Sequence, residues 1–181
     1  MIPDKFKVVL EEVGAMDLTH SGKSLYDHLY QTYQLLLSWG NPDDVCIGGL
    51  FHSIYSTQAY TQQAVPFEER EKVIEAIGKE AEQLAYLFCE CDRNSFYGTP
   101  GEDGLIPYQS RRNHQVLLVD EEIQRALLEI ESANIVEQHP RIKDRTDASR
   151  AIPIFSRLLD FNHLLTTGAV SGLKQCIQDF E

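Results

Sequence analysis

Apolar residues recur at every third or fourth position along most of this chain, which is the repeat of an amphipathic α-helix. The strongest case is the segment 25–39, in which Leu25, Leu29 and Leu36 share one face with His28. Glycine or proline lies between many of the periodic segments, as expected where helices end and begin. The pattern predicts an all-α fold, with helices over 4–13, 25–39, 42–55, 67–77, 79–92, 120–138, 148–167 and 169–180.

Three stretches in the second half of the chain depart from this pattern. The segment 93–107 is rich in glycine and proline and is predicted to be a long loop. The apolar run 116–119 predicts a short strand in a small β-hairpin near residues 108–119. A polar break is expected at 139–149, after the long helix. No repeat or linker divides the sequence, so residues 1–181 are predicted to form one domain.

The balance of charge narrows the classes of partner. The 181 residues include 28 acidic and 16 basic side chains, for a formal net charge of −12. Such a surface repels phosphate backbones, which argues against nucleic acid. No apolar run approaches the ~20 residues of a membrane span, and the N-terminus lacks the apolar stretch of a signal peptide. With four cysteines that form no C-x-x-C pair, these features favour a cytoplasmic protein that binds a small molecule.

Three polar side chains fall on apolar helix faces. His28 and His52 are 24 residues apart, and Asp92 comes at the end of the helix predicted over 79–92. Gly48 and Gly49 precede His52; since each costs about 1 kcal/mol in a helix relative to alanine, they indicate a close approach of another helix or a ligand. A bare buried carboxylate costs several kcal/mol, so Asp92 needs a partner. The structural alternatives are hydrogen-bonded core histidines and an ion pair of Asp92 with Arg93.

The motif around the histidines resembles a known superfamily. Residues 20–55, HSGKSLYDHLYQTYQLLLSWGNPDDVCIGGLFHSIY, look like the first half of an HD-type metal-dependent phosphohydrolase domain. The interval between the histidines is similar to that in the hydrolase domain of the guanosine tetraphosphate synthetase/hydrolase family. A closer resemblance, over 15–97, is to an uncharacterised HD-like family with His-Ser in place of His-Asp; here Ser53 follows His52. The resemblance implies an HD-like helical bundle with a core over 15–97 and C-terminal helices over 120–180.

The same resemblance implies a divalent metal ion, among Fe, Mn, Ni, Zn and Mg, bound by His28, His52 and Asp92. Ser53 departs from the pattern, and a neutral hydroxyl is a weak ligand for such ions, which argues against a dinuclear site. His20 is predicted to be a substitute ligand or a catalytic acid or base; the structural alternative is a histidine at the helix entry that bonds to the backbone. Asp92 is the second predicted catalytic group. The predicted substrate-binding residues are Lys23, Tyr55, Thr57 and Arg93.

The predicted function is a metal-dependent HD-like hydrolase of a small phosphorylated or polar metabolite. One alternative is a mononuclear Fe(II) oxygenase-type site, since two histidines and a carboxylate form a facial triad. Another is a metal-free ligand-binding or regulatory module, which is favoured by Ser53 where the pattern has an aspartate. A third is an interaction protein whose helices over 148–180 form a homodimer face, although their apolar residues suffice equally for an ordinary core.

Overall fold

The computed structural model of the chain describes residues 2–20 and 22–180, without the side chains of His20 and Arg145. This part is mostly helical, which confirms the predicted all-α class. None of its helices is long and apolar enough to cross a membrane. The elements are α1 (Asp4–Glu12), β1 (Thr19–His20), β2 (Lys23–Ser24), α2 (Leu25–Ser38), α3 (Asp43–Leu50), the 3₁₀ turn η1 (Phe67–Glu69), α4 (Arg70–Ile77), α5 (Lys79–Glu90), α6 (Arg93–Phe96), α7 (Glu121–Arg145), α8 (Ala148–Leu159) and α9 (Thr167–Gln178).

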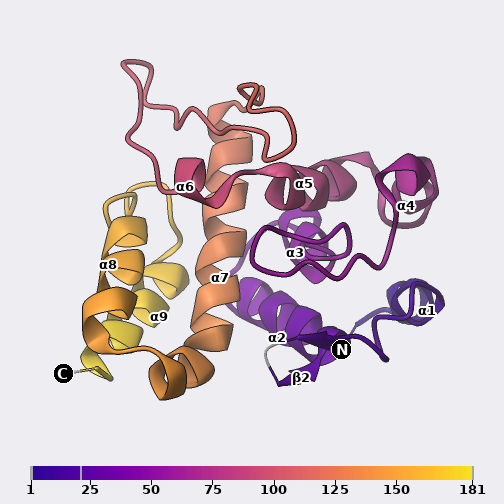
Figure 1. The fold of residues 1–181 in the computed structure, drawn as a ribbon, viewed down its shortest axis with the longest axis horizontal. Helices are drawn as coiled ribbons and strands as arrows, with labels where there is room; N and C mark the ends of the chain where they lie inside the picture. The colour runs from indigo at the N-terminus through magenta and orange to yellow at the C-terminus, as the bar shows by residue number, and fades with distance from the viewer. Residues whose placement is uncertain (1, 21, 181) are drawn as a thin grey trace.

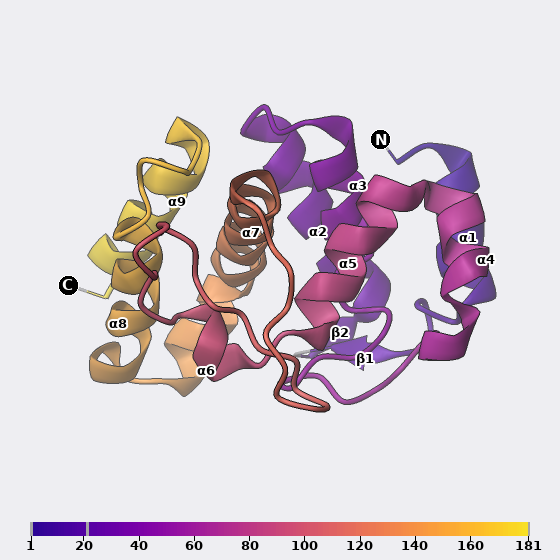
Figure 2. The same ribbon diagram turned by 90° about the horizontal axis from the view of Figure 1, so that it is seen from above.

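Helix α7 is the central element of the bundle. Figures 1 and 2 show it between two groups of helices, with α2, α3 and α5 on one side and α8 and α9 on the other. Because neighbours surround it, α7 buries residues around its whole circumference and not along a single stripe. Its buried apolar residues include Ala126, Leu127, Leu128, Ile130, Ala133 and Ile135.

The two glycines predicted to mark a close approach lie where helices touch. A Cβ atom added at Gly48 would be 2.9 Å from Cβ of Leu84 in α5. One added at Gly49 would be 2.2 Å from Cδ1 of Leu36 in α2. Because carbon atoms do not pack so closely, glycine at both positions allows α3 to lie this near to its neighbours.

Helix α3 ends at Leu50, earlier than the predicted end near residue 55. Residues 51–57 nevertheless stay buried, in irregular turns that carry His52. Ser56 in this segment has a φ of 65°, a left-handed conformation that is uncommon for serine. Its Oγ accepts a hydrogen bond of 2.9 Å from Nη2 of Arg111. Arg111 therefore helps to hold the segment that follows His52.

The polar break predicted at 139–149 is wrong for most of its length. Helix α7 continues through Pro140 and ends at Arg145. A proline inside a helix costs about 3 kcal/mol, but here the helix packs on α8 and α9. The ring of His139 lies edge-on to Phe155 and Phe180, with centroids 6.0 Å and 5.5 Å away. Tertiary packing outweighs the local preference for a break.

The hairpin predicted near 108–119 is reduced to one antiparallel bridge, between Gln109 and Val116. Leu118 follows with 93% of its surface exposed, so the apolar run is no buried strand. The regular strand pair lies instead in β1 and β2, between the helices predicted over 4–13 and 25–39. Of the apolar residues in the C-terminal helices, Phe155 and Leu158 are buried within the chain, and a homodimer through these helices stays a prediction.

We expect Gly48→Ala to lower the free energy of unfolding by about 1–3 kcal/mol, because the added methyl group would overlap Leu84. Denaturant unfolding measures the change. The matched control is Gly172→Ala in α9, where the nearest atom to an added Cβ is Cζ2 of Trp39, at 3.3 Å; its loss should be smaller. Alanine gains about 1 kcal/mol of helix propensity over glycine at both positions, so the close packing of α3 on α5 would be refuted if Gly48→Ala were no less stable than Gly172→Ala.

Candidate functional site

His28 and His52 lie against each other in the core of the bundle. His28 comes from the start of α2, and His52 from the turn that follows α3. Their Nε2 atoms are 3.1 Å apart, and both side chains are fully buried. The ring of Phe88 in α5 packs edge-on against His52, with centroids 5.0 Å apart. The structure thus brings together the two histidines selected by their position on apolar helix faces.

The second nitrogen of each ring is next to an oxygen acceptor. Nδ1 of His52 lies 2.6 Å from the backbone carbonyl oxygen of Gly49, and Nδ1 of His28 lies 2.5 Å from Oε2 of Glu137 in α7. Because a carbonyl and an ionised carboxylate only accept, each Nδ1 is assigned the hydrogen. In a neutral ring the lone pair is then on Nε2, so the two Nε2 lone pairs face each other. A proton or a cation shared between them suits this arrangement.

Glu137 connects the pair to two cationic side chains. Nη2 of Arg141 donates to Oε2 of Glu137 at 2.7 Å, and Nζ of Lys23 donates to Oε1. The carboxylate is buried, whereas the side chains of Lys23 and Arg141 are 17% and 23% exposed. A buried pair of imidazoles is therefore linked through one carboxylate to two cations near the surface.

These contacts determine which groups are charged. Burial by itself raises the pKa of Glu137, but hydrogen bonds from His28, Lys23 and Arg141 outweigh burial and lower this pKa to about 2. Burial lowers the pKa of His28 below its ordinary value, although the Glu137 carboxylate opposes this effect. At neutral pH the carboxylate is therefore ionised and the imidazole of His28 is neutral.

Asp92 lies outside this cluster and caps helix α6. Its Oδ1 accepts hydrogen bonds from the backbone N–H groups of Asn94 and Ser95, as an N-cap residue does. The inward carboxylate was predicted for a helix that continues to residue 92. Helix α5 ends at Glu90 and the chain is extended at Cys91, so Asp92 does not lie on the apolar face of α5. Among the side chains that the structure describes, which do not include that of His20, no three His, Cys, Asp or Glu residues gather as a metal site.

Three of the four predicted substrate-binding residues have structural partners. The hydroxyl of Tyr55 donates to Glu82 at 2.9 Å, and Thr57 accepts a backbone N–H within its own turn. Arg93 forms an ion pair of 3.1 Å with Glu131. All three contacts stabilise the fold around the site, and none of them is with the histidine pair.

The fourth, Lys23, lies beside the pair because it binds Glu137. The antiparallel register pairs the backbone of His20 with that of Lys23. The side chain of His20, the predicted substitute ligand, lies outside the part of the chain that the structure describes. The small β1–β2 pair thus brings the backbone of one predicted catalytic residue to the same end of α2 as His28.

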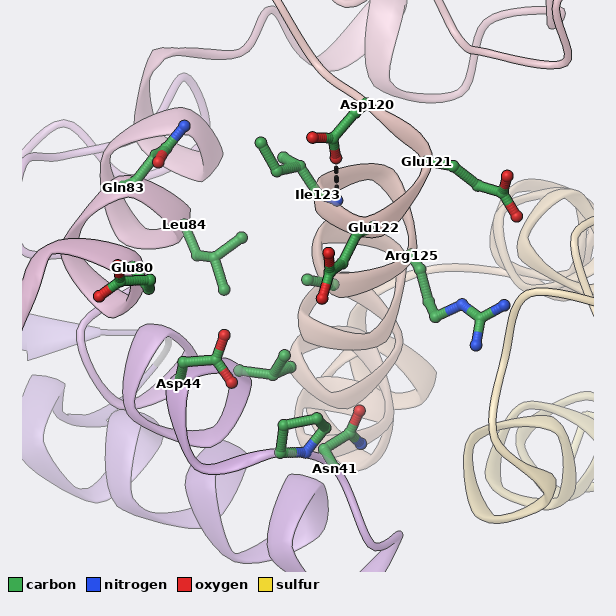
Figure 3. Close-up of a pocket in the computed structure, with 13 residues that line it drawn as sticks. Asn41, Asp44, Glu80, Gln83, Leu84, Asp120, Glu121, Glu122, Ile123 and Arg125 are labelled. Carbon is green, nitrogen blue, oxygen red and sulfur yellow. Dashed lines mark hydrogen bonds between the residues drawn. The ribbon is translucent and has the colours of Figure 1, made fainter.

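A cavity of about 630 Å³ opens elsewhere, where the N-terminal ends of α3, α5 and α7 meet (Figure 3). Its lining contains none of the predicted site residues. Figure 3 shows Asp44, Leu84 and Glu122 around the hollow, on three different helices. The remaining acidic residues that line the cavity are Glu80, Asp120 and Glu121.

Sequence reasoning did not identify Glu137, the carboxylate that the structure places against His28. The sequence pattern predicts the end of a helix at residue 138 and a polar break from residue 139, next to Glu137. One feature could have found it: Glu129, Glu131 and Glu137 lie within or directly after the apolar and small residues of 126–136. The structure shows all three of them buried. Buried carboxylates require partners, so each of them was a candidate for a polar site.

The comparisons with known proteins give one match. A family model described as "Domain of unknown function (DUF6817)" matches residues 9–93, which is less than half of the chain. No curated protein and no solved structure is significantly similar to the chain. The matched segment contains His28 and His52 but ends before α7, and therefore before Glu137.

Acidification should reveal the charged state of Glu137. The ordinary pKa of its carboxyl is 4.5 and the folded value is about 2, so the unfolded chain takes up the proton first and stability falls as pH drops from 4.5 towards 2. In Glu137→Gln the free energy of unfolding should depend less steeply on pH in this window. Urea unfolding at a series of pH values measures the slope. Glu122→Gln, exposed on the same helix, should keep the original slope; an unchanged slope in Glu137→Gln would argue against the lowered pKa.

Proposed function

We propose that His28 and His52 bind a divalent metal ion, and that the protein is an HD-like metal-dependent hydrolase of a small phosphorylated or polar metabolite. The observation that carries the proposal is the 3.1 Å separation of the two Nε2 atoms. Two imidazole nitrogens bound to one ion at about 2.1 Å lie roughly 3.0–3.4 Å apart. The oxygen acceptor at each Nδ1 is also the usual arrangement behind a metal-bound histidine.

His20 is the residue we propose to complete the ligand set. Its backbone pairs with that of Lys23, which reaches Glu137 beside His28. Asp92 suits this role less well, since it accepts the N-terminal hydrogen bonds of α6. When bound, the ion supplies an activated water and a contact for the substrate's negative charge.

Lys23 and Arg141 are the groups we propose to attract an anionic substrate. Both are cationic, partly exposed and in contact with Glu137, the partner of His28. On a chain with a net charge of −12, two neighbouring cations reverse the local field near the pair. A phosphorylated metabolite fits such a site better than a neutral one does.

The second candidate function is a metal-free ligand-binding or regulatory module. Two observations favour it. Both imidazoles are completely buried, as in a purely structural hydrogen-bonded pair. The residue after His52 is Ser53, where the HD pattern has an aspartate ligand. The Fe(II) oxygenase alternative needs a carboxylate that binds the same ion as the two histidines. Glu137 contacts His28, but at Nδ1 and not on the Nε2 side that faces His52, so it does not supply this third ligand.

Elemental analysis of protein purified without chelator or metal-affinity resin tests the proposal. We expect about one equivalent of metal per chain, and roughly a tenth of that or less in His28→Ala/His52→Ala, because the ligands are removed. His163→Ala, an exposed histidine, is the control and should keep the metal. The loaded protein should then release phosphate from simple phosphoesters. Absence of metal from every sample, even after reconstitution with Mn, Fe, Ni or Zn, would favour the metal-free module.

A further inference from the structure

The two histidines differ in what holds their Nδ1 atoms. His52 is held by the backbone carbonyl of Gly49, and His28 by the side chain of Glu137. A backbone carbonyl is present whatever the residue, whereas the carboxylate beside His28 exists only because residue 137 is a glutamate. A carboxylate behind a metal-binding imidazole fixes the ring's hydrogen and orientation and makes the other nitrogen a better ligand.

We propose that Glu137 is the positioning residue of the His28–His52 pair: it keeps the hydrogen of His28 on Nδ1 and turns Nε2 towards His52. The consequence for metal affinity rests on the proposed function, whereas the effect on the imidazole itself does not. Because Glu137 lies in α7, outside the matched residues 9–93, the site needs both halves of the chain.

The surroundings of Glu137 leave its carboxylate little freedom. Lys23 of β2 binds Oε1, while Arg141, one turn further along α7, binds Oε2 at 2.7 Å. The same Oε2 lies 2.5 Å from Nδ1 of His28. The carboxylate is thus fixed from both sides and presents one oxygen to the ring, which is the condition for a single tautomer.

An amide at position 137 cannot reproduce these contacts. An amide has one oxygen and one NH₂ group, so one orientation directs the NH₂ at the ammonium of Lys23. The other orientation directs it at Arg141 and at Nδ1 of His28. In that case Nδ1 must accept and the hydrogen moves to Nε2, which removes the lone pair that faces His52. Glu137→Gln should therefore abolish the single tautomer of His28 while changing few atoms.

The imidazole can be observed without any metal. In ¹⁵N-labelled, metal-free protein at about pH 8, above the ordinary histidine pKa, long-range ¹H–¹⁵N correlation spectra distinguish protonated from unprotonated ring nitrogens. We expect His28 to be protonated on Nδ1 in the unmodified protein, and to show the Nε2–H form in part or in full in Glu137→Gln. Glu131→Gln is the matched control: it is also a buried glutamate of α7 in an ion pair, but its partner is Arg93, so it should leave the tautomer unchanged.

Titration with Co(II), followed by visible absorbance, gives the second measurement. We expect the affinity to fall 10–100-fold in Glu137→Gln and to stay near the original value in Glu131→Gln. His28 protonated on Nε2 in the unmodified protein would overturn the positioning role, even if Glu137→Gln did not fold. The same tautomer and the same affinity in both glutamine variants would also overturn it. If the tautomer changed as expected but no variant and no unmodified protein bound Co(II), the positioning role would stand and the metal-dependent function would fall.

Discussion

The arrangement of this protein depends on the burial of carboxylates in a helix that has neighbours on every side. Helix α7 buries Glu129, Glu131 and Glu137 together with its apolar residues. A buried carboxylate without partners costs several kcal/mol, so each of the three restricts which element can pack next to it. The central helix is thereby a scaffold of fixed negative charges as well as an apolar surface.

The partners of these glutamates come from separate parts of the chain. Glu129 accepts a hydrogen bond from Asn41, between α2 and α3, and further hydrogen bonds from Thr166, the N-cap residue of α9. Glu131 accepts hydrogen bonds from Arg93 and Tyr97 in the region of α6, and one from Asn134 in its own helix. Glu137 joins α2 and β2 through His28 and Lys23. Breaking one of these contacts would leave a charge buried without its counterpart, which couples the packing of distant segments to the centre of the bundle.

At the histidine pair, the buried carboxylate of Glu137 contacts an ionisable ring, that of His28. Nδ1 of His28 lies against a carboxylate and Nδ1 of His52 against a backbone carbonyl, so a contact at Nδ1 orients each ring. The pair is fully buried, and neither histidine lines the cavity at the N-terminal end of α7. Glu137, the partner of His28, contacts the two partly exposed cations Lys23 and Arg141.

The sequence by itself determined the helical class, most helix positions and the two histidines, because the repeat of apolar residues is a local property that burial of one helix face imposes. It also located the contact of α3 with its neighbours, since paired glycines in a helix are costly without a close approach. Only the tertiary structure decided that Asp92 caps α6, that α7 continues through Pro140, and that Glu137 is the partner of His28. These outcomes depend on where a helix ends and on which charged side chains meet; His28 and Glu137, for example, are more than 100 residues apart in the sequence. The free energies that decide them come from tertiary packing and from the burial of charge, which no local sequence pattern contains.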